Sequence, residues 1–258
     1  MNTQPSSFQR AAVLVYGVIS YAAFFASFLY AVGFIGGFLV PRSLDSAPTR
    51  ALGPAVLINL ALLGLFAVQH SVMARPAFKR VLTRFIPEPA ERSTYVLMSS
   101  LALGLLFWLW EPMGGEVWRI ESMLGSTLLY AGFAAGLVLV LVTTFLINHF
   151  DLFGLRQVWK YFNRQRYQPL KFVTPGVYRL VRHPLYVGWI MTFWCTPTMS
   201  VAHLLFAVVT TAYILAAIQL EENDLIAVHG ADYIEYSRKT PMLVPNLGRP
   251  PEEAADQP

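Results

Sequence analysis

Most of the side chains that could do chemistry in this sequence stand at the ends of long apolar runs. They are histidines, carboxylates and one arginine, namely His70, His149, Asp151, Arg182, His183, Glu221 and Glu222. Ionisable groups at membrane depth are costly and are candidates for function, although a group at a helix end can also simply reach interfacial water. Several separate runs end in such groups on one predicted side, and this convergence favours a shared site.

Arg182 and His183 directly precede Pro184. Proline is typical of the first residue of a helix, because its missing N–H would be unpaired there. The free N–H groups and the partial positive charge of such a helix start suit a carboxylate or another anion. The alternative is a basic residue at the interface followed by an ordinary helix.

Glu221 and Glu222 follow the last apolar run, so we expect them at a helix C-terminus. Negative charge there is unfavourable by a few tenths to about 1 kcal/mol. The pair therefore indicates a cationic partner, either Arg182 or a cationic ligand, unless the helix end is simply solvated.

No metal site is expected. His149 and Asp151 are two residues apart and would not share a face of a regular helix. The sequence has no HExxH pattern, cysteine cluster, Walker loop or glycine-rich dinucleotide fingerprint. The single cysteine, Cys195, excludes an intrachain disulfide and is expected to be a small buried residue.

The elements that carry these residues are predicted to be membrane helices. The chain is 55% hydrophobic and 13% charged, whereas a soluble domain is about 25% charged. A helix needs about 20 apolar residues to cross a bilayer. We predict an all-α integral membrane protein with four transmembrane helices and a C-terminal helical hairpin, giving five to six membrane segments. Their ranges are Ala11–Val40, Ala51–Ala74, Thr94–Trp110, Ser126–Phe150, and the hairpin arms Leu185–Thr196 and Val201–Leu220.

The basic residues predict the orientation. With a cytoplasmic N-terminus, all of the 19 lysines and arginines except Arg42, Arg50 and Arg119 fall on the inner side, as the positive-inside rule requires. We therefore expect a multi-pass protein of the cell membrane whose site faces the cytoplasm. The net charge of +4 reflects these loops, and no nucleic-acid partner is expected.

The chain is interpreted as one domain over residues 1–258. Residues 1–150 form its four-helix part. Residues 151–248 contain a polar loop, the hairpin and a C-terminal segment. The remaining tail, 249–258, is rich in proline and acidic residues and is predicted to be disordered.

Two motifs carry a family resemblance. TPGVYRLVRHPLYVGW (Thr174–Trp189) and EENDLIAVHGADYIEYSRKTPMLVP (Glu221–Pro245) resemble the membrane methyltransferases related to isoprenylcysteine carboxyl methyltransferase and phospholipid N-methyltransferases. The shared pattern is G-x-Y-x-x-x-R-H-P-x-Y-x-G, then E-E and G-x-x-Y-x-x-Y. Upstream, FAVQHSVMARPAFKR (Phe66–Arg80) and NHFDLFGLRQVW (Asn148–Trp159) resemble the methanethiol S-methyltransferases, which lie near the NnrU-type membrane proteins.

The resemblance implies methyl transfer from S-adenosylmethionine to methanethiol, giving dimethyl sulfide. Carried over residue by residue, the implied cofactor-binding set is Tyr178, Arg182, His183, Tyr186, Gly188, Glu221 and Glu222. Arg182 and the helix start suit the carboxylate of this cofactor, and Glu221 or Glu222 suits its ammonium group.

A thiolate is the effective nucleophile, so a base near the acceptor sulfur is expected. The first hypothesis is His149, with Asp151 either orienting it or stabilising its charged form, and it requires the fourth helix to end or bend at His149. His70 is the alternative base. The partners implied are the small thiol and the lipid bilayer, from which an apolar substrate can reach the site.

Other functions stay open on the sequence. One is a related membrane methyltransferase that acts on a prenylcysteine carboxylate or a lipid amine. A second is a non-catalytic NnrU-type membrane protein. A third is a sterol-type reductase, which would need a nicotinamide cofactor.

Overall fold

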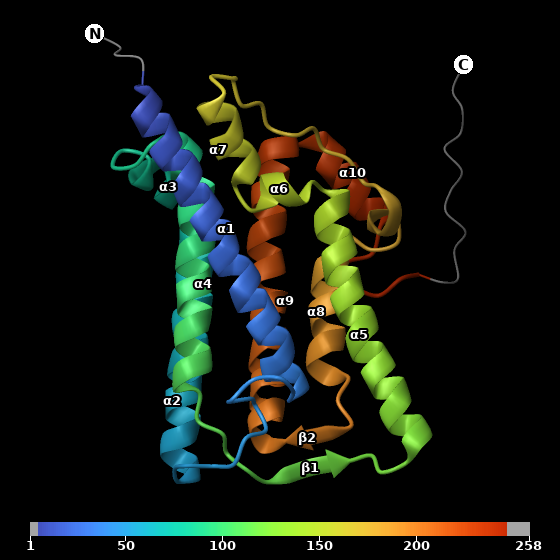
Figure 1. The fold of residues 1–258 in the computed structure, drawn as a ribbon. Coiled ribbons are helices and arrows are strands. Elements are labelled where there is room, and N and C mark those ends of the chain that lie inside the picture. Colours follow the sequence, from blue (N-terminus) through green and yellow to red (C-terminus); the bar gives the residue numbers. More distant parts are fainter. Residues whose placement is uncertain (1–4, 247–258) are drawn as a thin grey trace.

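The computed structural model describes residues 5–246 as a bundle of long helices that run between two ends (Figure 1). Within these residues, five helices are long and apolar enough to cross a bilayer, so the chain is an all-α integral membrane protein. The elements are α1 (Ser7–Gly36), α2 (Leu52–Ala74), α3 (Pro76–Leu82), η1 (Glu88–Ala90), α4 (Glu91–Leu109), β1 (Glu116–Arg119), α5 (Met123–Leu146), α6 (His149–Leu152), α7 (Leu155–Phe162), η2 (Gly176–Arg179), α8 (Pro184–Trp194), β2 (Thr198–Ser200), α9 (Val201–His229) and α10 (Ala231–Lys239).

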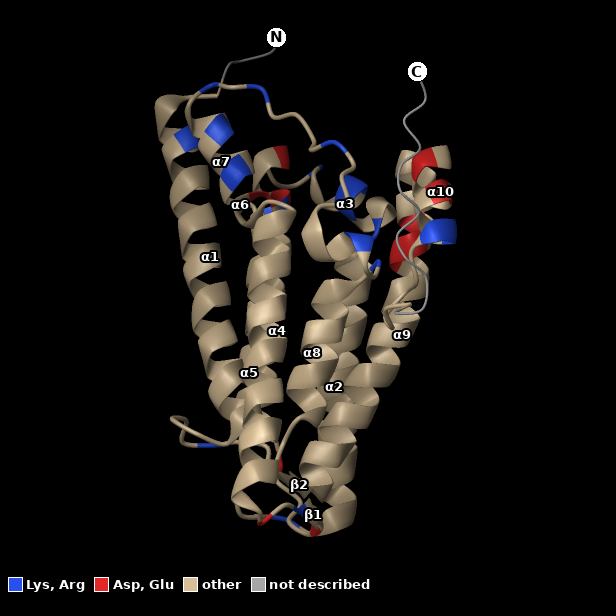
Figure 2. Ribbon diagram, turned by 90° about the vertical axis from the view of Figure 1, so that its right-hand side faces the viewer, with Lys and Arg blue, Asp and Glu red and all other residues tan. Residues whose placement is uncertain are grey.

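The two ends of the bundle differ in charge. One end carries α3, α6, α7 and α10, and most coloured lysine, arginine and carboxylate positions gather there (Figure 2); we call it the basic end. The other end carries β1 and β2, which pair antiparallel with Glu116 opposite Ser200; we call it the strand end. The expected separation of polar chemistry to one end is therefore present in the fold.

The first helix is displaced from the predicted range Ala11–Val40. It starts at Ser7 because Ser6 and Gln9 form a reciprocal capping box, in which each side chain bonds to the other's backbone N–H. It stops at Gly36 because Gly37 takes the left-handed conformation, with φ of 74°. The hydropathy pattern does not detect the Ser6–Gln9 capping box or the glycine cap at Gly37.

The fourth helix also ends earlier than the predicted Ser126–Phe150. Ser122 caps α5 at its start, and the helix stops at Leu146. Asn148 then turns the chain with a φ of 83°, and its side chain accepts a hydrogen bond from the N–H of Asp151 at 3.1 Å. The interruption before His149 is the one that the His149 hypothesis required.

The short arm of the hairpin does not span a membrane as a helix. The 11 residues of α8 rise about 16 Å, against about 30 Å of hydrocarbon. The chain then turns at Cys195 and bends at Pro197 before β2. Pro197 O accepts from Ile120 N–H at 2.8 Å, and Thr196 O accepts from Trp118 Nε1 at 3.2 Å. Irregular backbone at membrane depth is tolerated where protein groups satisfy it in this way.

The long arm corrects the expectation for Glu221 and Glu222. The apolar run ends at Leu220, but α9 continues to His229, so the two carboxylates lie about two turns before the helix end. The helix α9 continues beyond the apolar run because the polar residues that follow Leu220 are also helical. The unfavourable interaction with a helix C-terminus therefore does not apply, and the partners of both carboxylates come from other elements.

Candidate active site

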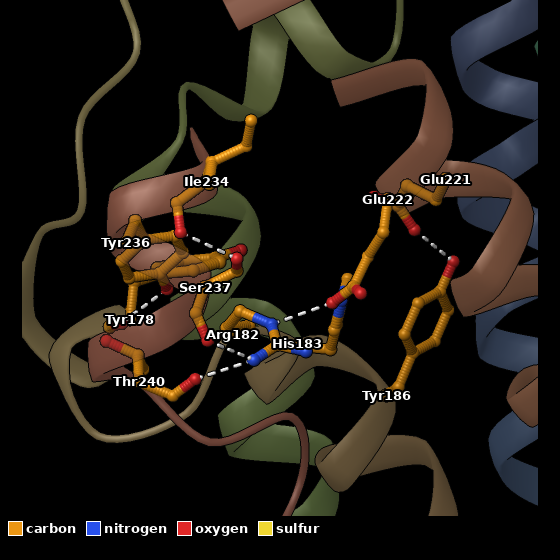
Figure 3. A network of polar contacts seen from close by, with 10 residues as sticks. All are labelled: Tyr178, Arg182, His183, Tyr186, Glu221, Glu222, Ile234, Tyr236, Ser237 and Thr240. Atoms are coloured by element: carbon orange, nitrogen blue, oxygen red, sulfur yellow. Dashed lines mark hydrogen bonds and ion pairs between the residues drawn. The ribbon is translucent and has the colours of Figure 1, made fainter. Parts of the chain in front are cut away.

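A charged cluster at the basic end joins α8 to α9 (Figure 3). Arg182 Nε donates to Glu222 Oε1 at 2.7 Å, and the ring Nε2 of His183 lies 3.0 Å from the same oxygen. The three side chains are mostly buried, where an unpaired charge would be costly. The local sequence places them because Pro184 starts α8 directly after Arg182 and His183.

The same arginine fastens the C-terminal segment to the site. Arg182 Nη1 donates to the carbonyl oxygens of Ser237 at 2.9 Å and Thr240 at 2.7 Å. The backbone N–H of Arg182 donates to Pro241 O at 2.9 Å. Tyr236 of α10 donates its hydroxyl to Tyr178 O at 2.5 Å. The R-H-P and G-x-x-Y-x-x-Y motifs, far apart in sequence, therefore form one structural unit.

Glu221 has a different environment from Glu222. Its Oε2 accepts a hydrogen bond from the Tyr186 hydroxyl at 2.8 Å, and the phenols of Tyr178 and Tyr95 are close enough to interact with it electrostatically. Burial and this carboxylate raise the pKa of Tyr178. Within residues 5–246, no arginine, lysine or histidine forms an ion pair with Glu221. Glu221 is thus surrounded by tyrosine hydroxyl groups and has no ion-pair partner among the described residues.

Tyr233 lies beside the charged cluster, and the sequence reasoning did not single it out. Its side chain is 2% exposed, and its hydroxyl lies close to Glu222 without completing a hydrogen bond to any described residue. Burial raises its pKa, so the phenol stays neutral. Phe172 packs against it, with ring centroids 5.8 Å apart, and also against His229 at 5.0 Å. The sequence could have indicated this residue, because Tyr233 is the first tyrosine of the G-x-x-Y-x-x-Y motif.

His70 lies in a polar group within the bundle, between α2 and α4. The Tyr95 hydroxyl is 2.7 Å from His70 Nε2, and Ser99 Oγ is 3.1 Å from His70 Nδ1. The neighbouring Gln69 has a buried side-chain oxygen with no hydrogen-bond partner among the described residues. Because Tyr95 also interacts with Glu221, it links this group to the charged cluster.

His149 lies in a second polar group, formed by α1, α5 and α6. Thr144 Oγ1 already donates to Leu141 O, so it accepts from His149 Nδ1, 2.9 Å away. The other ring nitrogen, Nε2, is then the acceptor for the Tyr21 hydroxyl at 2.8 Å. Burial lowers the pKa of His149 below its ordinary value, which favours the neutral ring.

Asp151 does not orient His149 through the direct contact that we expected. Its carboxylate pairs with Arg156 Nη1 at 2.7 Å and accepts from the Tyr167 hydroxyl at 3.2 Å. The reason is geometric: α6 restarts at His149 and directs residues two positions apart to different sides.

Gly188 has a packing environment. A Cβ built on it would lie 2.7 Å from Gly136 O and 2.9 Å from a methyl group of Val140. A Cβ built on Gly136 would likewise lie 2.6 Å from the carbonyl oxygen of Gly188. The pair lets α5 and α8 touch along their backbones, so Gly188 positions the helix that begins at the charged cluster.

Comparisons with known proteins identify the family. A methanethiol S-methyltransferase of Crocosphaera subtropica is 58% identical over 244 residues, covering 95% of this chain and 96% of that protein. Methanethiol S-methyltransferase 2 of Bradyrhizobium diazoefficiens is 52% identical, covering 93% and 92% of the two chains. The chain belongs to the methanethiol S-methyltransferase family.

Further comparisons agree with this membership. The Mycobacterium tuberculosis member is 48% identical, covering 92% of this chain and 97% of that protein. The phospholipid methyltransferase family model matches residues 131–232, which contain the R-H-P motif and both glutamates. No solved structure matches.

Within residues 5–246, no group of three or more histidine, cysteine or carboxylate side chains is placed to hold a metal ion.

Proposed function

We propose that this member of the family transfers the methyl group of S-adenosylmethionine to methanethiol and so forms dimethyl sulfide. The observation that carries the proposal is its close, nearly full-length similarity to proteins named for this acceptor. The site supports it independently: among the described residues Glu221 has no cationic partner and the buried hydroxyl of Tyr233 completes no hydrogen bond, and both side chains lie at one end of the bundle.

The residues present fit S-adenosylmethionine. When bound, this cofactor supplies a methyl group on a positively charged sulfur. Glu221 lacks a cationic partner among the described residues, so it suits the ammonium group or the sulfonium charge. Tyr233 Oη offers an unused hydrogen bond, and the rings of Phe172 and His229 beside it suit a purine.

Arg182 has a more limited role than the sequence indicated. Its Nε and Nη1 are taken by Glu222 and by two backbone carbonyls. Only Nη2 makes no hydrogen bond to the described residues, and it is the atom that we propose for the cofactor carboxylate. The rest of the guanidinium holds Glu222 and α10 in position, and His183 supports the same carboxylate.

The acceptor thiol has to lose a proton, and we propose the Tyr95–His70 pair for this step. The thiol proton passes to Tyr95 Oη while the phenol proton passes to His70 Nε2, which leaves a thiolate and an imidazolium. The 2.7 Å contact between Tyr95 and His70 and the proximity of Tyr95 to Glu221 favour this route. The side-chain oxygen of Gln69 has no hydrogen-bond partner among the described residues and offers an acceptor for a thiol S–H.

His149 is the second candidate for the base. Its Nε2 accepts a hydrogen bond from Tyr21, and burial keeps the ring neutral, so it is competent to take a proton. No hydrogen bond in the described part of the chain links either histidine to the Arg182–Glu222 cluster. However, Tyr95, the partner of His70, interacts electrostatically with Glu221, whereas burial alone shifts the pKa of His149 and of its partner Tyr21. This difference is why we place His149 after His70.

The proposed location is the cell membrane, with the basic end facing the cytoplasm. Of the lysines and arginines in the described residues, only Arg42, Arg50 and Arg119 belong to the segments near the strand end (Figure 2), and positive charge is retained on the cytoplasmic side. A water-soluble methyl donor would then approach from the cytoplasm, whereas a small apolar thiol would approach through the bilayer.

Purified full-length protein in phosphatidylcholine nanodiscs tests the reaction. With S-adenosylmethionine labelled in its methyl group and with methanethiol, labelled dimethyl sulfide should collect in the headspace. Folded protein that binds the cofactor but forms no such product would exclude methanethiol as the acceptor.

An acceptor panel separates the other functions. A prenylcysteine and a lipid amine, each supplied with the labelled cofactor, test the two related acceptors. A non-catalytic protein would show no thermal shift with S-adenosylmethionine, and a reductase would show a shift with NADPH instead. We expect a shift with S-adenosylmethionine only.

A further inference from the structure

A polar cavity at the basic end lies outside the proposed active site. It has a volume of about 280 Å³ and is formed by the start of α1 and the end of α7. Its lining residues are Pro5, Arg10, Tyr161, Arg164, Gln165 and Arg166. Three of the six are arginines and none is acidic. In the described part of the chain, none of these arginines forms an ion pair with a carboxylate.

Arg10 is the only buried residue among these three arginines. Its side chain is 7% exposed, with Nη1 donating to Pro5 O at 2.5 Å and Nη2 donating to Ser7 Oγ at 3.1 Å. These neutral acceptors orient the guanidinium without neutralising it. A cation that is buried in this way normally has an anionic partner, and the partial positive charge of the α1 start adds to the same field.

The opposite wall is held in place. Val158 of α7 packs so closely on α1 that a Cβ at Gly17 would lie 2.6 Å from it. Beyond α7, Gln165 N–H donates to Lys160 O at 2.8 Å and Arg164 N–H donates to Tyr161 O at 3.1 Å. These bonds fold the chain back at the helix end, so Arg164 and Arg166 line the same cavity as Arg10.

The length of α1 indicates that the cavity lies at the level of lipid head groups. The 30 residues of α1 are about 45 Å long, whereas the hydrocarbon layer is about 30 Å thick, so the ends of α1 extend beyond it. Phe8 is 82% exposed and Trp159 is 57% exposed. Large exposed aromatic side chains at such a level are typical of the membrane interface.

We propose that this cavity binds a phosphate group, supplied by the head group of an anionic phospholipid. Arginine fits phosphate oxygens with paired hydrogen bonds, and basic pockets at the ends of membrane helices suit anionic head groups. The inference does not depend on the proposed reaction.

Native mass spectrometry of the full-length protein in detergent tests the site. Dioctanoyl phosphatidylglycerol is titrated into wild-type protein and into the double variant R164Q/R166Q, whose side chains are exposed and should not affect folding. We expect saturable binding by the wild type and roughly tenfold or weaker binding by the double variant. R84Q, which removes an exposed arginine outside the cavity, should bind as the wild type does.

Two further arms identify the source of the phosphate. Dioctanoyl phosphatidylcholine carries no net charge and should bind at least tenfold more weakly than phosphatidylglycerol. Inorganic phosphate tests a soluble source: if it competes at equal concentration with the same dependence on Arg164 and Arg166, the site binds phosphate but not specifically lipid. If the double variant retains wild-type affinity for both probes, the proposal is wrong. If the variant R10Q folds, its affinity for phosphatidylglycerol provides a second test of the site.

Discussion

Arg182 and Glu222 form an ion pair with 2.7 Å between Nε and Oε1, and this contact joins the residues just before α8 to the beginning of the polar part of α9. The arginine also donates to two carbonyl oxygens of the α10 region. One side chain therefore connects three elements, and its planar fork is required because a single ammonium group cannot direct bonds to all of them.

We predict that Arg182→Lys lowers both stability and cofactor affinity although it keeps the charge. Loss of the bonds to Ser237 O and Thr240 O should cost about 1–3 kcal/mol and should weaken S-adenosylmethionine binding at least tenfold. Calorimetric titration and thermal unfolding measure the two effects. Arg179→Lys, three residues earlier, is the matched control, and equal behaviour of the two variants would contradict the role assigned to Arg182.

The two adjacent glutamates should behave differently. Glu221→Gln removes a charge that has no cationic partner in the described residues, so we expect weaker cofactor binding, roughly tenfold to a hundredfold, with little loss of stability. Glu222→Gln leaves Arg182 and His183 without their carboxylate, so it should also destabilise the fold by about 3–5 kcal/mol. If both variants lose the same amount of stability, Glu221 is structural as well.

The sequence predicted the membrane segments and the collection of polar groups at one end because both depend on composition and charge. It also brought Arg182, His183, Glu221 and Glu222 together through a motif. It did not predict that α9 would carry the glutamates two turns inside a helix, because hydropathy marks where a helix leaves the bilayer and not where it ends.

The sequence also did not predict several side-chain contacts that depend on how the backbone turns and packs. Asp151 pairs with Arg156 and Tyr167 instead of His149. The turn at Asn148 determines this choice of partners, because it sets the direction of both side chains. Tyr233 reaches the site because Arg182 fastens the α10 region to α8. Such choices depend on backbone geometry and on long-range packing, which residue spacing does not encode.

The close contact of Gly188 with Gly136 predicts a large effect of one methyl group. Gly188→Ala places a Cβ 2.7 Å from the Gly136 carbonyl oxygen, and backbone atoms cannot move aside as a side chain can. We expect a loss of about 1–3 kcal/mol or of folded protein, measured by thermal unfolding and yield in detergent. Gly64→Ala, which meets no atom within 4 Å, should be neutral or slightly stabilising.

The lowered pKa of His149 predicts a pH-dependent contribution to stability. Burial disfavours the imidazolium, so the folded protein binds this proton less readily than the unfolded chain, where the pKa is about 6.5. The contribution is fully present above this pH and is lost as the pH falls below it. His149→Gln should therefore lose less stability than the wild type between pH 7.5 and pH 5, as measured by thermal unfolding. An identical decrease in both proteins would contradict the assignment.

The final prediction distinguishes the two candidate bases. If Tyr95 and His70 carry the proton, Tyr95→Phe and His70→Gln should each lower kcat about 10²–10⁴-fold, the range typical of general base catalysis, while the affinity for S-adenosylmethionine stays within a few-fold. Each variant should also lose the plateau of the pH–rate profile near neutrality, because the rate then depends on thiolate formed in solution and rises with pH. Tyr30→Phe, near the strand end, should have no effect on either quantity. If His149→Gln instead produces the low kcat and the altered pH profile while His70→Gln does not, the proton passes through the Tyr21–His149 pair, whose 2.8 Å contact provides an equivalent relay on the other side of the bundle.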